Sequence, residues 1–256
     1  MCVRWCSRSG RLTVVSRRHI SIDSAQTGVD DRHIPPQWPR LLGARPPATG
    51  ASALRTNIYV DAFNLYYGAL KGSPYRWLDL FTLLSRMLPR DEIHRIRYFT
   101  ASIQPRESDP LAPQRQQIHL RALATVPCVT VHYGSFMPKT KVRPLVNGGA
   151  YVEVRDTEEK GSDVNLASYL IHDGHRGDYE QAVVVSNDSD LRTPIELVRS
   201  DLGLRVGLLN PRKRVALGLA GVADFYKPIR KGVLGASQFP DELVDETGSF
   251  RKPASW

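Results

Sequence analysis

Two aspartates one residue apart, Asp188 and Asp190, follow directly after a short apolar run of the chain. The surrounding sequence is VVVSNDSDLRTPIE, and its first residues have the composition of a strand covered on both faces. Two carboxylates this close resist joint ionisation unless a cation lies between them. Carboxylate oxygens without His or Cys partners are the ligands that Mg²⁺ or Mn²⁺ prefers. The pair therefore predicts a divalent-metal site at the end of this strand.

Two further acids stand at comparable places in the chain. Asp61 closes the apolar segment NIYV, and Asp163 begins the segment SDVNLA, whose continuation has helical spacing. Taken alone, Asp163 is explained as a helix-dipole carboxylate, and Asp188 or Asp190 as a turn former. In an open parallel sheet, however, ligands gather at the carboxyl ends of the strands, and Asp61 and Asp188 lie close together if their strands are neighbours. Together, Asp61, Asp163 and Asp188 predict a metal site, with Asp190 completing or supporting the set.

The elements that must hold these acids are strands alternating with helices, a pattern typical of a mostly parallel sheet between two helical layers. We therefore predict a three-layer α/β/α sandwich. Residues 137–150 have turn chemistry, and TPIELVRSDLG has the capping box of a helix that starts at Thr193. That start leaves NDSDLR as a loop between strand and helix. The patterns predict strands at 57–60, 93–103, 128–136, 151–154, 181–186 and 204–209, and helices at 80–88, 113–126, 162–174 and 193–203.

The chain of 256 residues is long enough for one sizeable domain with appendages. Residues 1–55 are rich in Arg, Pro, Ala and Gly, and we interpret them as a disordered basic arm or an extension, with an organelle transit peptide as the alternative. Residues 56–230 carry the regular pattern and form the predicted domain. Residues 231–256 lack clear periodicity and are expected to pack loosely on that domain or to serve contacts.

The net charge of +9 favours contact with polyanions. Three cysteines provide no disulfide framework and indicate a reducing compartment, which we take as the cytoplasm. No apolar stretch is long enough for a membrane-spanning helix. The sequence also lacks a phosphate-binding P-loop, a dinucleotide fingerprint and a nucleophile elbow, which excludes the enzyme classes that depend on them.

Three ordered motifs, YVDAFNLYYG, EEKGSDVNLASYL and VVVSNDSDL, together resemble the NYN domain family (LabA-like group), a branch of the PIN-like nucleases. The resemblance covers roughly residues 56–230 and implies metal-dependent hydrolysis of phosphodiester bonds, usually in RNA. It makes the four aspartates the catalytic and metal-binding set, with Asn64 orienting a water or ligand. It also matches Lys160 and Ser186 to positions that would contact the nucleic acid. The chain departs from the family pattern at Asn187, where glycine is usual; Asn tolerates the positive φ that such a position can require.

We therefore predict an Mg²⁺- or Mn²⁺-dependent ribonuclease, with DNA as a further substrate and homo-oligomerisation left open. One alternative is an inactive NYN module that binds RNA or acts as a scaffold, and another is a small-molecule phosphatase. Cations around the acids would hold the nucleic-acid backbone. The candidates are Lys139, Lys141, Arg143, Arg212, Lys213 and Arg214, together with Arg230 and Lys231.

Overall fold

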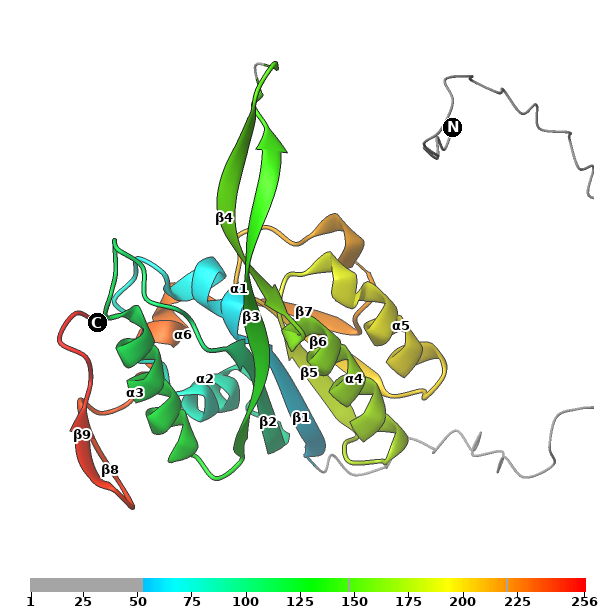
Figure 1. Cartoon of the computed structure of the whole chain (residues 1–256). Coiled ribbons are helices and arrows are strands. Elements are labelled where there is room, and N and C mark those ends of the chain that lie inside the picture. Colours follow the sequence, from blue (N-terminus) through cyan, green and yellow to red (C-terminus); the bar gives the residue numbers. More distant parts are fainter. Residues whose placement is uncertain (1–52, 147, 220) are drawn as a thin grey trace, which may run out of the picture. The chain divides into compact units, whose positions relative to one another are not determined.

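The computed structural model describes residues 53–256 except positions 147 and 220, and it leaves aside the side chains of 137–139, 155–159 and 217. The expected N-terminal arm lies almost wholly outside the described residues. Seven strands form one sheet in the order β4-β3-β2-β1-β5-β6-β7, in which only β4 runs antiparallel to its neighbour (Figure 1). The strands are β1 (Leu54–Asp61), β2 (Asp91–Ala101), β3 (Val129–Pro144), β4 (Tyr151–Lys160), β5 (Gln181–Val185), β6 (Arg205–Asn210) and β7 (Phe225–Pro228).

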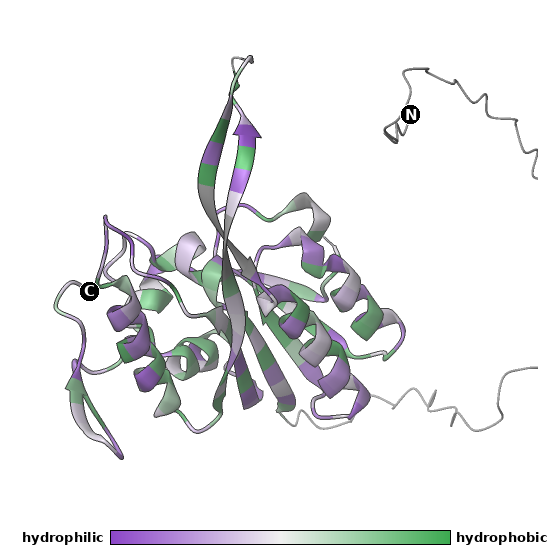
Figure 2. Cartoon of the chain, viewed as in Figure 1, coloured by the Kyte–Doolittle hydropathy of each residue, from purple (hydrophilic) through white to green (hydrophobic). Residues whose placement is uncertain are grey.

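The strands β3 and β4 extend much further than the sequence pattern predicts. Residues 137–144 were expected to form a turn, but they continue β3 and pair with β4 as far as Pro144 opposite Tyr151. The hairpin rises well beyond the rest of the sheet (Figure 1), and apolar and polar residues are interspersed along it (Figure 2). The expectation was wrong because Pro138, Pro144 and the NGG run at 147–149 have turn chemistry, whereas a ribbon outside the packed layers tolerates proline.

Helices cover both faces of the sheet, which gives the predicted three-layer α/β/α architecture (Figure 1). One face packs against α2, α3 and α6, and the other packs against α4 and α5. Helices lie on both faces because each parallel pair of strands needs a crossover connection, usually through a helix. The helices are α1 (Ala62–Leu65), α2 (Leu80–Met87), α3 (Ala112–Ala124), α4 (Ser162–His175), α5 (Arg192–Ser200) and α6 (Lys231–Gly235), and α1 continues as a π-helix, Tyr66–Leu70.

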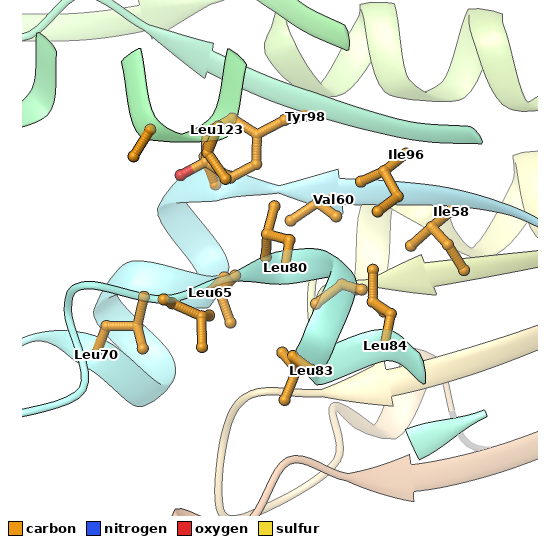
Figure 3. Packing of buried hydrophobic residues seen from close by; sticks show 14 of the residues in the cluster. Ile58, Val60, Leu65, Leu70, Leu80, Leu83, Leu84, Ile96, Tyr98 and Leu123 are labelled. Carbon is orange, nitrogen blue, oxygen red and sulfur yellow. The ribbon is translucent and has the colours of Figure 1, made fainter. Parts of the chain in front are cut away.

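The core follows from the alternation of side chains along the central strands. In β1, Ile58 and Val60 face the α2 side, whereas Tyr59 faces the α4 side. Figure 3 shows Leu80 and Leu84 of α2 packed beside the strand residues of the first cluster. Full burial of each such side chain stabilises the fold by about 1.5–3 kcal/mol. This packing fixes β1 at the centre of the sheet, with its carboxyl end at the edge where the acids lie.

The C-terminal segment is part of this core, so the expectation of loose packing was wrong. Phe239 and Phe250 are buried in the same cluster as α2, and the Trp77 indole donates a hydrogen bond to the Pro240 carbonyl at 2.8 Å. A hairpin of β8 (Glu242–Asp245) and β9 (Gly248–Arg251) follows, and Arg121 of α3 binds the Asp245 carboxylate. Periodicity did not predict these contacts because the anchors are single aromatic residues in short elements. Among the described helices, none has the length and apolarity needed to cross a membrane.

Candidate active site

Asp61 and Asp188 lie at the carboxyl ends of two neighbouring strands. β1 pairs with β5 in parallel, with Val60 opposite Val185, so the predicted adjacency of these strands is confirmed. Asp61 is 6% exposed and caps α1 by accepting a hydrogen bond from the Asn64 backbone N–H at 2.9 Å. A short polar side chain at an N-cap satisfies one of the four unpaired N–H groups at a helix start. The cap therefore holds the Asp61 carboxylate at the end of the strand.

Ser186 connects the two aspartates. Its hydroxyl donates to Asp61 Oδ2 at 2.9 Å and accepts from the Asp188 backbone N–H at 3.1 Å. Asp188 in turn accepts from the Asp190 backbone N–H at 3.1 Å and caps a short 3₁₀ helix, Ser189–Leu191. Ser186 is fully buried, which does not fit the contact with nucleic acid that the resemblance implied, and its hydroxyl links the two aspartates from behind.

Asp163 comes to the same place from a third segment. It lies in the first turn of α4, directly after β4. The connection is a single residue, Gly161, whose φ of 96° is one that glycine adopts at little cost. A cavity of about 160 Å³ brings this acid together with Asp61 and Asp188. Its full lining is Asp61, Phe63, Asn64, Tyr67, Ser162, Asp163, Asp188 and Arg212.

Asp190 and Lys160 do not line this cavity, and both side chains are exposed. Asp190 lies outside the cavity because the predicted capping box does not form. The helix α5 begins at Arg192 without a side-chain cap, directly after the 3₁₀ helix, so Thr193 is not its N-cap. The residues between β5 and α5 are therefore a helical turn capped by Asp188 rather than an open loop that aims both carboxylates at one point.

The predicted cations fall into two groups. Arg212 lines the cavity, and its Nε donates to Asn64 Oδ1 at 3.4 Å, while Lys213 and Arg214 are exposed in the same loop. Lys141 and Arg143 belong to the projecting part of the β3–β4 hairpin. Lys139 is also in β3, but its side chain lies outside the described residues. The exposed Arg230 and Lys231 lie at the start of α6.

Asn187, the residue that departs from the family pattern, ties the cavity to the loop of residues 211–216, here called the rim loop. Its side-chain nitrogen donates to the Arg214 carbonyl at 3.1 Å, and its side-chain oxygen accepts from the Ala216 N–H at 2.9 Å. Its backbone N–H donates to Asn64 Oδ1 at 3.2 Å. A glycine could make only the last of these bonds. Asn187 is thus a connection between the acid-bearing turn and the loop that carries Arg212.

The sequence patterns missed the two aromatic residues of the cavity wall. Phe63 packs edge-on against Phe136 of β3, with ring centroids 5.6 Å apart, and Tyr67 is half exposed. Their position in the sequence could have indicated this. Phe63 and Tyr67 come two and six residues after Asp61, and residues this close to the end of a strand stay near it when a helix starts there. In the neighbouring strand β2, burial and then the Asp61 carboxylate raise the pKa of the Tyr98 phenol, so this group stays neutral.

The donors fit a divalent ion in their chemistry. Three carboxylates and no His or Cys line the cavity, which is the oxygen set that Mg²⁺ and Mn²⁺ bind. Within the described part of the chain, however, no three His, Cys, Asp or Glu side chains are grouped closely enough to hold an ion as they stand. A shared ion would therefore require these carboxylates to approach one another.

A second polar cluster, buried on the α4 face of the sheet, is separate from the cavity. Arg97 binds Asp173 with two hydrogen bonds, at 2.7 and 2.9 Å, and the Tyr59 hydroxyl donates to the same carboxylate at 2.8 Å. Arg97 also contacts His132 Nε2 at 3.0 Å and stacks on the Tyr169 ring. Burial, followed by the Arg97 charge, lowers the pKa of His132. These contacts hold α4 on the sheet and thereby position the helix that starts with Asp163.

Comparisons with known proteins identify the family of this chain. The NYN domain model matches residues 55–226. A curated relative, 6-hydroxy-3-succinoylpyridine 3-monooxygenase HspA of Pseudomonas putida (strain DSM 28022 / S16), is 33% identical over 236 residues, covering 79% of this chain and 75% of the relative. A solved structure, a protein of unknown function (VPA0982) from Vibrio parahaemolyticus RIMD 2210633, is 20% identical with a TM-score of 0.47, covering 71% of this chain and 96% of that one. The chain belongs to the NYN domain family, a nuclease-type family.

Proposed function

We propose that the protein is a divalent-metal-dependent ribonuclease. The observation that carries this proposal is the convergence of Asp61, Asp163 and Asp188, from three separate segments, on one cavity. The chain as a whole carries a net charge of +9. Three carboxylates at one point repel one another, which costs free energy. A cation between them removes that cost, and the surrounding positive charge attracts a polyanion.

Each residue of the cavity has a role in this proposal. The three aspartates would hold Mg²⁺ or Mn²⁺, which supplies a Lewis acid and lowers the pKa of water. Asn64 uses its side-chain oxygen for the Asn187 and Arg212 bonds, so its nitrogen is the part that can donate to a water or a phosphate oxygen. Arg212, whose guanidinium suits phosphate geometry, binds the backbone of the RNA.

The test is cleavage of end-labelled single-stranded RNA with Mg²⁺ or Mn²⁺, beside EDTA. Asp188→Asn and Asp190→Asn form a matched pair, because both remove one carboxylate from the same turn and only Asp188 lines the cavity. We expect Asp188→Asn to lower kcat by about 100-fold or more, since even outer groups around a metal are worth about 10–100-fold. Asp190→Asn should keep activity within about threefold of wild type because its side chain is exposed to solvent. Cleavage that persists in EDTA, or is unaffected by Asp188→Asn, would contradict the proposal; RNA binding without any product would favour the inactive NYN module.

A second candidate function is monooxygenation of a hydroxypyridine acid. It is supported by the 33% identity to a protein named for that activity, over 79% of this chain. The cavity also offers two aromatic rings, Phe63 and Tyr67, and the Arg212 guanidinium, groups that bind an aromatic acid. A monooxygenase places one atom of dioxygen in its product and reduces the other to water with two electrons from a reductant. The test is substrate-dependent uptake of dioxygen with 6-hydroxy-3-succinoylpyridine and reduced nicotinamide; no uptake in excess of the protein-free control would exclude it.

A further inference from the structure

The β3–β4 hairpin begins beside the cavity and leads away from it. At its base, Ser135 pairs with Lys160, and Phe136 packs against Phe63 of the cavity wall. From there the two strands stay paired until Pro144 meets Tyr151, and the ribbon rises clear of the layers of the domain (Figure 1). The hairpin therefore extends from the rim of the proposed active site into solvent.

The outer part of this ribbon exposes two large apolar side chains. Tyr151 is 74% exposed and Val142 is 59% exposed, and neither belongs to either hydrophobic cluster of the described residues. Lys141 lies opposite Val154, and Arg143 lies opposite Val152. Residues that are directly opposite in an antiparallel pair share a face, so cations and apolar side chains lie side by side.

This combination suits single-stranded nucleic acid. Proteins that hold single strands combine cations that follow the backbone with apolar and aromatic surfaces on which bases stack. The hairpin offers both, on its two faces: Lys141 and Arg143 carry the charge on the face of Val152 and Val154, and Tyr151, opposite Pro144, is an exposed ring on the other face. A single strand that crosses the edge of the ribbon contacts both faces. A second copy of the chain would be the occupant favoured by a purely apolar ribbon, but the cations on the Val152 and Val154 face favour a polyanion.

We propose that the outer part of the β3–β4 hairpin is a substrate arm that holds single-stranded RNA leading into the cavity. The inference rests on the proposed function, and it adds a length requirement. The Arg143 pair lies eight residue steps along β3 from the Ser135 pair, which is about 27 Å at about 3.4 Å per step. A stacked strand advances about 3.4 Å per nucleotide, so the arm spans about eight nucleotides. A trinucleotide bound in the cavity cannot reach Arg143.

The experiment compares an arm variant, Lys141→Ala/Arg143→Ala/Tyr151→Ala, with a charge-matched control, Arg86→Ala/Arg90→Ala. The control residues are exposed and lie near the start of β2, at the sheet edge opposite the cavity. Binding of a labelled single strand of about 20 nucleotides is measured in EDTA by fluorescence anisotropy, so the arm is tested whether or not the protein cleaves RNA. We expect the arm variant to lose about 10- to 100-fold in affinity and the control to lose less than about threefold.

Two further readouts separate this inference from the proposed function. The slope of log affinity against log salt should fall by about 1.4 in the arm variant, since each phosphate that the two removed cations no longer neutralise accounts for about 0.7. If RNA is cleaved, kcat/KM should fall for the long strand and stay within about twofold for a trinucleotide. If neither substrate is cleaved, the proposed nuclease activity is refuted and the binding result still stands. Unchanged binding, an equal loss in the control, or a change of oligomeric state in the arm variant on light scattering overturns the arm.

Discussion

The side chain of Asn187 should control the opening of the rim loop. Asn187→Gly removes the bond to the Arg214 carbonyl and the bond from the Ala216 N–H, 3.1 and 2.9 Å long, and keeps the backbone bond to Asn64. Each such bond contributes about 1 kcal/mol, so local opening of the loop should become easier by about 2 kcal/mol. The Arg214 carbonyl keeps its bond from Asn210, so the effect should stay local.

Limited trypsin digestion measures this opening because the rim loop contains three cleavage sites, after Arg212, Lys213 and Arg214. When opening is fast relative to cleavage, the rate follows the population of the open loop, and about 2 kcal/mol corresponds to a rise of about 30-fold. Cleavage after Arg106, in a different loop, is the internal control and should not change. A rim-loop cleavage rate within about twofold of wild type would refute the reasoning that the Asn187 amide holds this loop.

Three further substitutions test the packing of the domain by urea unfolding. Burial lowers the pKa of His119 from 6.5 to about 4, so the folded protein favours the neutral imidazole. The contribution of His119 to the free energy of unfolding should therefore be fully present above pH 6.5, and the free energy should fall by about 3 kcal/mol by pH 4. In His119→Phe that part of the pH dependence should vanish. Asp173→Asn should cost about 3–5 kcal/mol because it leaves the buried Arg97 guanidinium without its carboxylate. Gly207→Ala should cost about 1–3 kcal/mol, since a Cβ there would meet the Phe225 ring at 2.0 Å.

Each of these has an outcome that would contradict it. For His119, the contrary result is a fall in the free energy of unfolding between pH 7 and pH 4 that is as large in His119→Phe as in the wild type. For the Arg97 pair, replacing both partners by apolar residues should cost less than Asp173→Asn alone. For Gly207, a Phe225→Leu background should relieve the clash, so an equal loss in that background would place the cause elsewhere.

The sheet and its central acids could be predicted because they depend on local patterns. Ile58, Tyr59 and Val60 form a continuous apolar run, and strands of that kind are central in parallel sheets. Asp61 and Asp188 therefore had to appear at one edge once β1 and β5 were neighbours. The hairpin could not be predicted in the same way, because its prolines and the NGG run have turn chemistry and the partner that makes residues 137–144 a strand is the opposite strand.

The details of the site depended on contacts that sequence patterns do not contain. Asp188 and Asp190 look equivalent along the chain, yet Asp188 caps a 3₁₀ turn and Asp190 is exposed in it. The Thr193 capping pattern was overridden because that turn continues directly into α5. Asn187 was expected only to tolerate the backbone of a glycine, whereas its amide makes two bonds to a loop some 27 residues further on.

The two proposed functions place different chemistries at the same cavity, because function is determined at the site and not by the fold. Both candidate substrates, RNA and a pyridine acid, are anions, so either needs cations to enter a cavity lined by Asp61, Asp163 and Asp188. Loss of activity in EDTA or in Asp188→Asn therefore cannot by itself separate them. Length can separate them: a small acid bound in the cavity of about 160 Å³ would lie close to the aspartates and would not reach Arg143. The arm variant should thus weaken action on a long RNA and leave turnover of a small acid unchanged, and the opposite pattern would assign the cavity to the small molecule.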